Sequence, residues 1–443
     1  MTTSGERLLA HGIGGAKDLP IPTELAIAGA VAALTVSFTV LALAWRTPRF
    51  GRSRSHPVPE WLSAGVDSAA FAILARGFGF LVFAWAMMAA VFGKDVAINP
   101  FLGMFYVLLW VAVVPLSLVL GPFYRAVSPV RTINLLFAKV TGGDPEEGLF
   151  RYPERLGQWP AAAGLFAFVW MELVYPSSTE LGPVRLWFAL YVAVMLIGGA
   201  LFGNRFYERA DPFEVYSTLV GHLSIWGRDD DGRLVIRVPM ANLARVPPLP
   251  GLVAVVSVLF GSTAFDSFKD SNVWLRHIQD SSVSPFVQNN LMLISFCLVV
   301  GVLFSVATAA TGVEAGQRRS ELPSLFAHSM VPIVVGYIAA HYLSYLIEVG
   351  QLTVIQLSDP FTRGDNYLGT ANWSVSYWLS EQPTLLATTK VVAVVVGHVL
   401  GVVAAHDRAI ELLPRRHQLT GQLPLLIVMV GFTISGLYLL FAA

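Results

Sequence analysis

The chain has 443 residues, of which 55% are hydrophobic and only 13% are charged, and its mean hydropathy is +0.63. A soluble domain carries roughly 25% charged residues, so this composition excludes an ordinary soluble protein and indicates that lipid covers much of the surface. Lys plus Arg and Asp plus Glu balance at 29 each, and this balance gives no indication of a nucleic-acid partner.

Two further classes are excluded by the residues themselves. Cys297 is the single cysteine, so a disulfide within the chain and a cysteine-ligated zinc or iron–sulfur site are both ruled out. Residues 1–22 lack the short apolar run and small-residue cleavage site of a signal peptide. We expect them to form an N-terminal tail on the outer side of the membrane.

Ten segments are apolar and long enough to cross a bilayer, which takes about 20 residues. In chain order they cover 23–45, 70–92, 100–121, 159–177, 183–203, 250–266, 288–311, 326–348, 384–406 and 421–441. The weakest is 250–266, because it is short and contains Gly251 and Gly261. The sequence therefore predicts an all-α polytopic bundle of about ten spans, with a single transmembrane domain over 23–441.

Arginine and lysine are concentrated in alternate connections between these segments. The basic connections are 46–69, 122–158, 204–249, 312–325 and 407–420. Because loops rich in Lys and Arg stay in the cytoplasm, the pattern predicts that both termini lie outside. We expect a multi-pass protein of a bacterial plasma membrane, that is, the inner membrane.

Three connections have patterns of their own. The 204–249 loop contains Asp229 to Asp231, Gly232 and then apolar–polar alternation to Val238, which predicts a small hairpin. Thr132 to Val140 is typical of an interfacial amphipathic helix. The predicted outer loop 349–383 is long and polar, and long loops are often functional.

Ionisable side chains inside apolar segments are costly and indicate a functional site by default. Several of them fall in the predicted outer half of four spans, namely Glu172, Asp266, His341, Glu348 and Lys390. One span also repeats polar residues at helical spacing, and this stripe must face other helices or a water-filled cavity rather than lipid. The stripe consists of Tyr337, His341, Tyr345 and Glu348.

This set of residue types fits more than one chemistry. His341, Glu348 and Asp266 could ligate zinc or a similar divalent metal, which would activate a water. Alternatively, His341 acts as a general base oriented by a carboxylate, and Lys390 stabilises an oxyanion. A structural interpretation stays open too: Glu172 and Lys390 as a buried ion pair, and His341 as an interhelical hydrogen-bonding residue. For His328, His406 and Asp407 the structural interpretation places them at the membrane interface.

Several stretches together resemble a known family. They are Arg151 to Pro160 leading into Phe168 to Glu172, Ala210 to Tyr216, Gly261 to Asp266, Ala340 to Tyr345, and Gly397-His398 followed by Ala405 to Arg408. This combination resembles the multi-pass bacterial membrane proteins known as fenitrothion hydrolases, and it extends from the second predicted span to the ninth. The resemblance implies hydrolysis of a phosphotriester, with cleavage of an aryl ester from phosphorus.

A lipophilic ester of this kind could enter such a bundle from the bilayer, so we expect the lipid bilayer and a lipophilic small molecule as partners. Two other functions are compatible with the sequence. One is a transporter or channel with an intramembrane ion site. The other is a haem or redox protein, in which His341 and His398 on neighbouring spans could be axial ligands. A role as partner in a larger membrane-protein complex is the third alternative.

Overall fold

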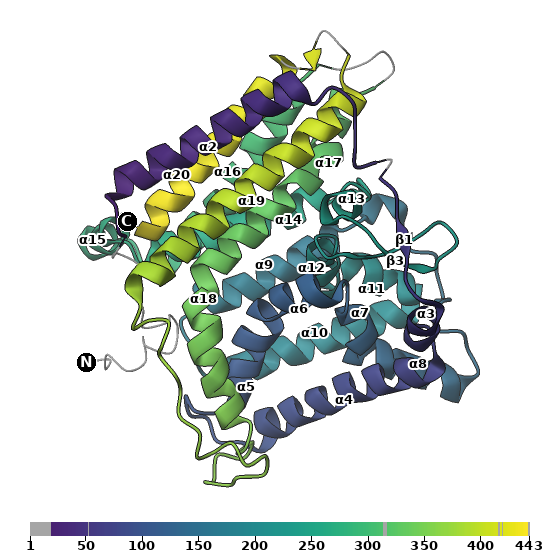
Figure 1. Cartoon of the computed structure of the whole chain (residues 1–443). Helices are drawn as coiled ribbons and strands as arrows, with labels where there is room; N and C mark the ends of the chain where they lie inside the picture. The colour runs from purple at the N-terminus through teal and green to yellow at the C-terminus, as the bar shows by residue number, and fades with distance from the viewer. Residues whose placement is uncertain (1–18, 52, 313–316, 415–416, 419, 442–443) are drawn as a thin grey trace. The chain divides into compact units, whose positions relative to one another are not determined.

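The computed structural model describes residues 19–51, 53–312, 317–414, 417–418 and 420–441 (Figure 1). Most of the predicted N-terminal tail 1–22 therefore lies outside the described residues. The same is true of three arginines in the predicted basic loops, Arg52, Arg415 and Arg416.

The described chain is built from α-helices, with one small sheet of two- and three-residue strands. Within the described ranges, eight helices are long and apolar enough to cross a membrane. They are α2 (Thr23–Ala44), α4 (Ala69–Phe92), α10 (Leu181–Phe202), α14 (Leu252–Lys269), α16 (Pro285–Ala309), a span over Arg319–Gln356 that contains α18 (Met330–Gln356), α19 (Pro383–Leu412) and a span over Thr420–Phe441 that contains α20 (Leu423–Phe441). These are the helices of a membrane protein.

The remaining two predicted spans also contain helices, but these differ from a straight span. The segment 100–121 forms α5 (Pro100–Gly103), the π-helical η1 (Met104–Val111) and α6 (Val113–Leu120), with a bend of 44°. A π-helical stretch is a recognised cause of such a bend. The segment 159–177 forms α9 (Trp159–Leu173), whose 15 residues rise only about 22 Å. Counting the bent pair as one span gives nine in the described chain.

Two helix ends differ from the predicted spans. Helix α18 continues to Gln356 instead of ending near 348, so the connection to α19 is shorter than the predicted loop 349–383. The weakest predicted segment, 250–266, forms α14, which continues to Lys269 and is among the most buried of the spanning helices. Its glycines and hydroxyl residues are therefore packing positions, and they do not break the helix.

The sequence predicted a single transmembrane domain over 23–441. In the structure, contacts within the chain group it into two compact units. The first comprises Ser55–Arg237 and Ser344–Tyr377; the second contains α2, Val238–Leu343 and the chain from Trp378 onward. The boundary at 343/344 falls inside α18.

Short helices and the sheet complete the first unit. The helices are α3 (Glu60–Val66), α7 (Tyr124–Val127), α8 (Pro129–Thr141), α11 (Asn204–Ala210) and α12 (Pro212–Gly221). Strand β3 (Leu234–Ile236) pairs antiparallel with β2 (Trp226–Arg228) and with β1 (His56–Pro57), in the order β1-β3-β2. The structure thus places a hairpin in the 204–249 segment, and its turn uses Gly232 at φ 79°, a conformation that favours glycine.

In the second unit, α14 packs along α16 (Figure 1). Gly261 makes this approach possible, because a Cβ atom at this position would lie 2.7 Å from the Cα of Cys297 and 2.8 Å from its nitrogen. Small residues that let backbones approach closely are typical of helix pairs in membranes. The remaining helices of this unit are α13 (Pro239–Leu243), α15 (Asn272–Asp280) and α17 (Leu322–Phe326).

Replacing Gly261 by alanine should destabilise the second unit, because the new methyl group would force α14 away from α16. Overpacking of this kind costs about 1–3 kcal/mol. Gly431→Ala in α20 is the matched control, since a Cβ at this position meets nothing within 4 Å. We expect thermal unfolding in detergent to show a lower Tm for Gly261→Ala and an unchanged or slightly higher Tm for Gly431→Ala. Equal Tm values for the two variants would contradict the packing role of Gly261.

Candidate functional site

Two of the residues predicted from the sequence meet in the second unit. Asp266 lies in the last turn of α14 and His341 in α18. The Nε2 atom of His341 lies 2.8 Å from Oδ2 of Asp266. The Asp266 side chain is 2% exposed and that of His341 is 10% exposed, so the pair is shielded from solvent but not sealed.

The other ring nitrogen of His341 contacts a residue that the sequence did not single out. Nδ1 lies 3.0 Å from Oγ of Ser267, the neighbour of Asp266 on α14. The hydroxyl of Tyr337, one turn before His341 on α18, donates to the same Oγ at 3.1 Å. The imidazole therefore sits between a carboxylate and a serine hydroxyl, with a tyrosine behind the serine.

This arrangement is fully hydrogen-bonded in both protonation states of the histidine. In the neutral form, Nε2–H donates to Asp266 and Nδ1 accepts the Ser267 hydroxyl. In the protonated form, Nδ1–H donates to Oγ, and the hydroxyl turns to the Thr263 carbonyl oxygen, which is 3.2 Å away. A histidine with partners for both states can take up and release a proton with little rearrangement.

Asp266 has further donors besides His341. The Tyr342 hydroxyl donates to Oδ2 at 2.7 Å, and Nζ of Lys269 forms an ion pair with Oδ1 at 3.0 Å. Two hydrogen bonds on Oδ2 and an ammonium group beside Oδ1 stabilise the anion in a fixed orientation, which is what orients an adjacent histidine.

The predicted divalent metal site gains no support from this geometry. Among the residues that the structure describes, no three His, Cys, Asp or Glu side chains are grouped so that they could hold a metal ion. The predicted ligands His341 and Asp266 hydrogen-bond to each other. The third predicted ligand, Glu348, is buried and belongs to the first unit.

The remaining predicted residues lie elsewhere. Glu172 belongs to the first unit, where it interacts electrostatically with the phenols of Tyr106 and Tyr216. Lys390 is buried on α19 in the second unit. The structural ion pair between Glu172 and Lys390 would join the two units and stays a prediction.

His398 is also fully buried on α19. Its Nδ1 lies 2.8 Å from the Val394 carbonyl oxygen, while Nε2 has no hydrogen-bond partner within the described part of the chain. In contrast, both ring nitrogens of His341 are engaged. The two histidines considered as a haem pair therefore differ in the availability of their nitrogens.

The stretch Ala405 to Arg408 anchors the chain that leaves α2. The carboxylate of Asp407 accepts the backbone N–H groups of Arg49 and Phe50, at 2.7 and 3.2 Å, and the indole N–H of Trp45. The ring nitrogens of His406 contact Gln422 and the Trp45 carbonyl. These partners give His406 and Asp407 a structural role.

Ser267, Lys269 and Tyr342 were missed by sequence reasoning. Ser267 and Lys269 follow Asp266 directly, and Tyr342 follows His341, so proximity to the predicted pair was a signal that could have found them. A serine or tyrosine at a span end is common, however, and carries no charge to mark it.

A second buried polar cluster lies in the first unit, within the stretch Ala210 to Tyr216. Arg131 and Glu214 form a two-pronged ion pair, with both N–O distances at 2.6 Å. Asp211 caps α12: its Oδ1 accepts the N–H groups of Phe213 and Glu214 and the hydroxyl of Tyr191 at 3.1 Å. Its Oδ2 atom is buried and has no hydrogen-bond partner among the residues that the structure describes.

Asp211 and Glu214 lie one turn apart but differ in their partners. Burial and the nearby Glu214 carboxylate raise the pKa of Asp211 to about 7, against the lowering effect of the hydrogen bonds to Oδ1. With three donors on Oδ1 and, among the described residues, none on Oδ2, the carboxylate form has one buried oxygen without a donor, which favours the neutral acid. Glu214 is held as a carboxylate by Arg131.

Comparison of the chain with protein-family models, with curated proteins and with solved structures gave no match. The resemblance to fenitrothion hydrolases accordingly stays a prediction.

The Asp211 geometry predicts a pH-dependent stability. Its pKa is higher in the folded chain than in the unfolded one, so Asp211 makes the wild type progressively less stable as pH rises from about 4 to 7. Asp211→Asn mimics the neutral acid. We expect the Tm of this variant to exceed that of wild type by a margin that grows as the pH rises from 5 to 7 and then stays constant to pH 8.

Glu214→Gln is the matched control, because it removes a charge one turn away but leaves buried Arg131 without its anion. Losing one partner of a buried ion pair typically costs about 3–5 kcal/mol, so this variant should have a lower Tm at every pH tested. If Asp211→Asn were destabilised equally at pH 5 and pH 8, Asp211 would not be the neutral acid described above.

Proposed function

We propose that the protein is a membrane-embedded hydrolase acting on a lipophilic ester, with Ser267 as nucleophile, His341 as general base and Asp266 as the residue that orients the histidine. The observation that carries this proposal is the continuous chain of hydrogen bonds from Ser267 Oγ through both ring nitrogens of His341 to Asp266, at 3.0 and 2.8 Å. A serine, a histidine and a carboxylate in this order are recognised as a hydrolytic unit by their geometry, whatever the fold.

The chemistry follows from the contacts. Nδ1 of His341 takes the hydroxyl proton of Ser267 as Oγ attacks the carbonyl carbon or phosphorus of the ester. The bond to the leaving group breaks, and Nδ1–H protonates the departing alcohol. In the second step, Nδ1 takes a proton from a water molecule whose oxygen bonds to the acyl carbon or phosphorus. The bond from that atom to Oγ breaks, and Nδ1–H returns its proton to Oγ, which releases the acid and restores Ser267.

The surroundings fit this sequence of events. Tyr337 fixes the position of the serine oxygen, and Tyr342 and Lys269 hold Asp266 as an anion. The Lys269 side chain is 18% exposed and brings positive charge to the end of α14, where charge develops on the ester oxygen. This end is also where a spanning helix leaves the bilayer, so an ester dissolved in lipid can reach it.

The substrate proposal comes from the resemblance noted above, which implies a phosphotriester of the fenitrothion type. Carbonyl esters and phosphotriesters share the attack and departure steps, so both belong in the first assay. A nitrophenyl leaving group makes either reaction visible by absorbance.

A transporter or channel is the second candidate, because the chain from Tyr337 through Ser267 and His341 to Asp266 could also conduct a proton. The haem alternative would need a free nitrogen on His341, and the engagement of both nitrogens favours proton transfer instead. Proton flux into liposomes containing the full chain, with no ester hydrolysis, would favour the transporter.

The hydrolase proposal predicts the outcome of a single substitution. Ser267→Ala should lower hydrolysis of p-nitrophenyl butyrate and of dimethyl p-nitrophenyl phosphate by about 10³-fold or more, because the nucleophile is lost. A fluorophosphonate probe should label wild type at Ser267, as located by peptide mass spectrometry, and should not label the variant.

Ser262→Ala is the matched control. Ser262 is buried on the same helix, but its hydroxyl contacts the Leu259 carbonyl rather than His341. It should retain wild-type labelling and activity. Activity that survives in Ser267→Ala, or labelling at another residue, would sink the assignment of the nucleophile.

A further inference from the structure

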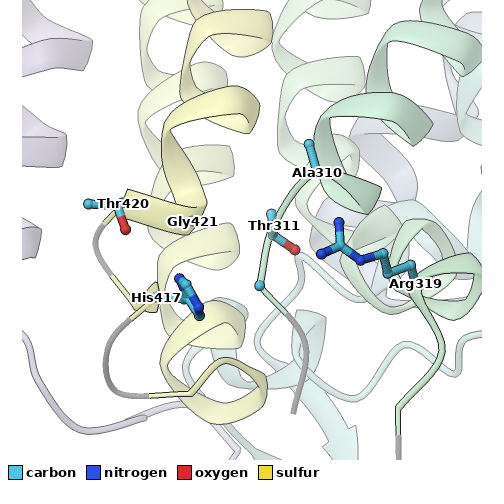
Figure 2. A pocket seen from close by; sticks show the side chains of 7 residues that line it. Ala310, Thr311, Arg319, His417, Thr420 and Gly421 are labelled. Carbon is cyan, nitrogen blue, oxygen red and sulfur yellow. The ribbon is translucent and has the colours of Figure 1, made fainter. Parts of the chain in front are cut away.

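A polar cavity of 370 Å³ lies in the second unit between the end of α16 and the start of α20 (Figure 2). Arg319 lies on one side of it, His417 on the other, and Thr311 between them. Thr420 and the glycines at 312 and 421 form most of the remaining lining. This cavity is separate from the Ser267–His341–Asp266 site.

The cavity lies at a defined depth relative to a membrane. Helix α16 is a spanning helix that ends at Ala309, and α20 is a spanning helix that begins at Leu423. The lining residues 310–312 directly follow the first helix, and Thr420 and Gly421 lie within three positions of the start of the second. The cavity is therefore at the level where these helices leave the bilayer, which is the level of lipid headgroups.

The groups around the cavity suit an anion. One Nη of Arg319 donates to the Ala309 carbonyl at 3.1 Å, which caps the end of α16 and fixes the guanidinium. A guanidinium has five N–H donors in a planar fork, so others remain for a ligand. The imidazole of His417 offers at least one N–H in either protonation state. None of the described side chains that line the cavity is a carboxylate.

Two glycines hold the walls of the cavity close together. A Cβ atom at Gly312 would lie 2.6 Å from the Cβ of His417, and one at Gly421 would lie 3.2 Å from the backbone nitrogen of Gly312. The backbone that follows α16, at Gly312, thus packs directly against the segment that precedes α20, at Gly421. This contact sets the position of the His417 ring. Such a fixed placement is what a binding site requires.

Apolar side chains are exposed within about two turns of the cavity on both helices. Val306 on α16 is 63% exposed, and on α20 Leu423 and Ile427 are 45% and 69% exposed. In a bilayer these side chains face acyl chains. A ligand with a negative headgroup and apolar tails would satisfy both the cavity and the helices beside it.

We propose that this cavity binds the phosphate group of an anionic phospholipid through Arg319 and His417, with its acyl chains along α16 and α20. Basic pockets between spanning helices are a known means of recognising anionic headgroups. The planar fork of an arginine matches the oxygens of a phosphate.

The test is lipid-dependent stabilisation of the full chain purified in detergent. Dioleoylphosphatidylglycerol should raise the Tm of wild type by several degrees, and native mass spectrometry should detect the retained lipid. Dioleoylphosphatidylcholine and sodium phosphate at the same concentration should each give less than half of this shift. Arg319→Gln and His417→Gln should each lose at least half of the phosphatidylglycerol shift.

Arg318→Gln is the matched control, because Arg318 is an exposed neighbour of the same charge that does not line the cavity. It should keep the wild-type shift. His417→Gln leaves the bond from Arg319 to Ala309 in place, so it tests the site even if Arg319→Gln is poorly folded. A full shift in His417→Gln, or an equal loss in Arg318→Gln, would overturn the proposal. A full shift with sodium phosphate alone would overturn the lipid as ligand.

Discussion

The contact on which the candidate site depends is the imidazole of His341, held between two consecutive residues of another helix. A polar side chain inside an apolar bundle costs several kcal/mol unless it is hydrogen-bonded. Asp266 and Ser267 point from the last turn of α14 to the two nitrogens of one ring. This constraint fixes the rotation of α14 relative to α18 at this point, because a turn of either helix would break both hydrogen bonds to the His341 ring.

The same constraint has a different outcome in the first unit. Asp211 and Glu214 lie on one turn, and burial disfavours the charge of both. Glu214 faces the guanidinium of Arg131, whereas Asp211 has only neutral donors. Two carboxyl groups three residues apart on one helix thus differ in their partners, and only the one beside the guanidinium has an opposite charge to match its own. The interior tolerates one full charge here because it is matched by one opposite charge.

The eight spanning helices could be predicted from the sequence because each is a long apolar run, and bilayer thickness sets the length of such runs. The bend in 100–121 could not, since a π-helical stretch such as Met104–Val111 has no distinctive composition. The span predicted over 326–348 ends at Glu348, eight residues before the end of α18 at Gln356. In the structure that glutamate is buried and the helix continues.

The candidate site shows the same limit. Depth along a helix follows from residue number, so the sequence could place Asp266 and His341 at a similar level. It could not give the direction in which each side chain points around its helix, which decides contact. For this reason Glu172, Glu348 and Lys390 were grouped with the pair by depth alone, and Ser267 was overlooked although it completes the hydrogen-bonded chain.

The order of the helices in the second unit places its two sites apart. Asp266 and Ser267 of the Ser267–His341–Asp266 site lie at the carboxyl end of α14, and the chain then passes through α15 to the start of α16. Helix α16 is long and apolar enough to cross a membrane, and the cavity lies at its own carboxyl end. The whole of α16 therefore separates the two sites along the chain. Helix α14 carries Asp266 and Ser267 and, through Gly261, packs against α16, at whose end the cavity lies. A lipid bound in the cavity would therefore hold α16 in place, and with it the surface against which α14 packs.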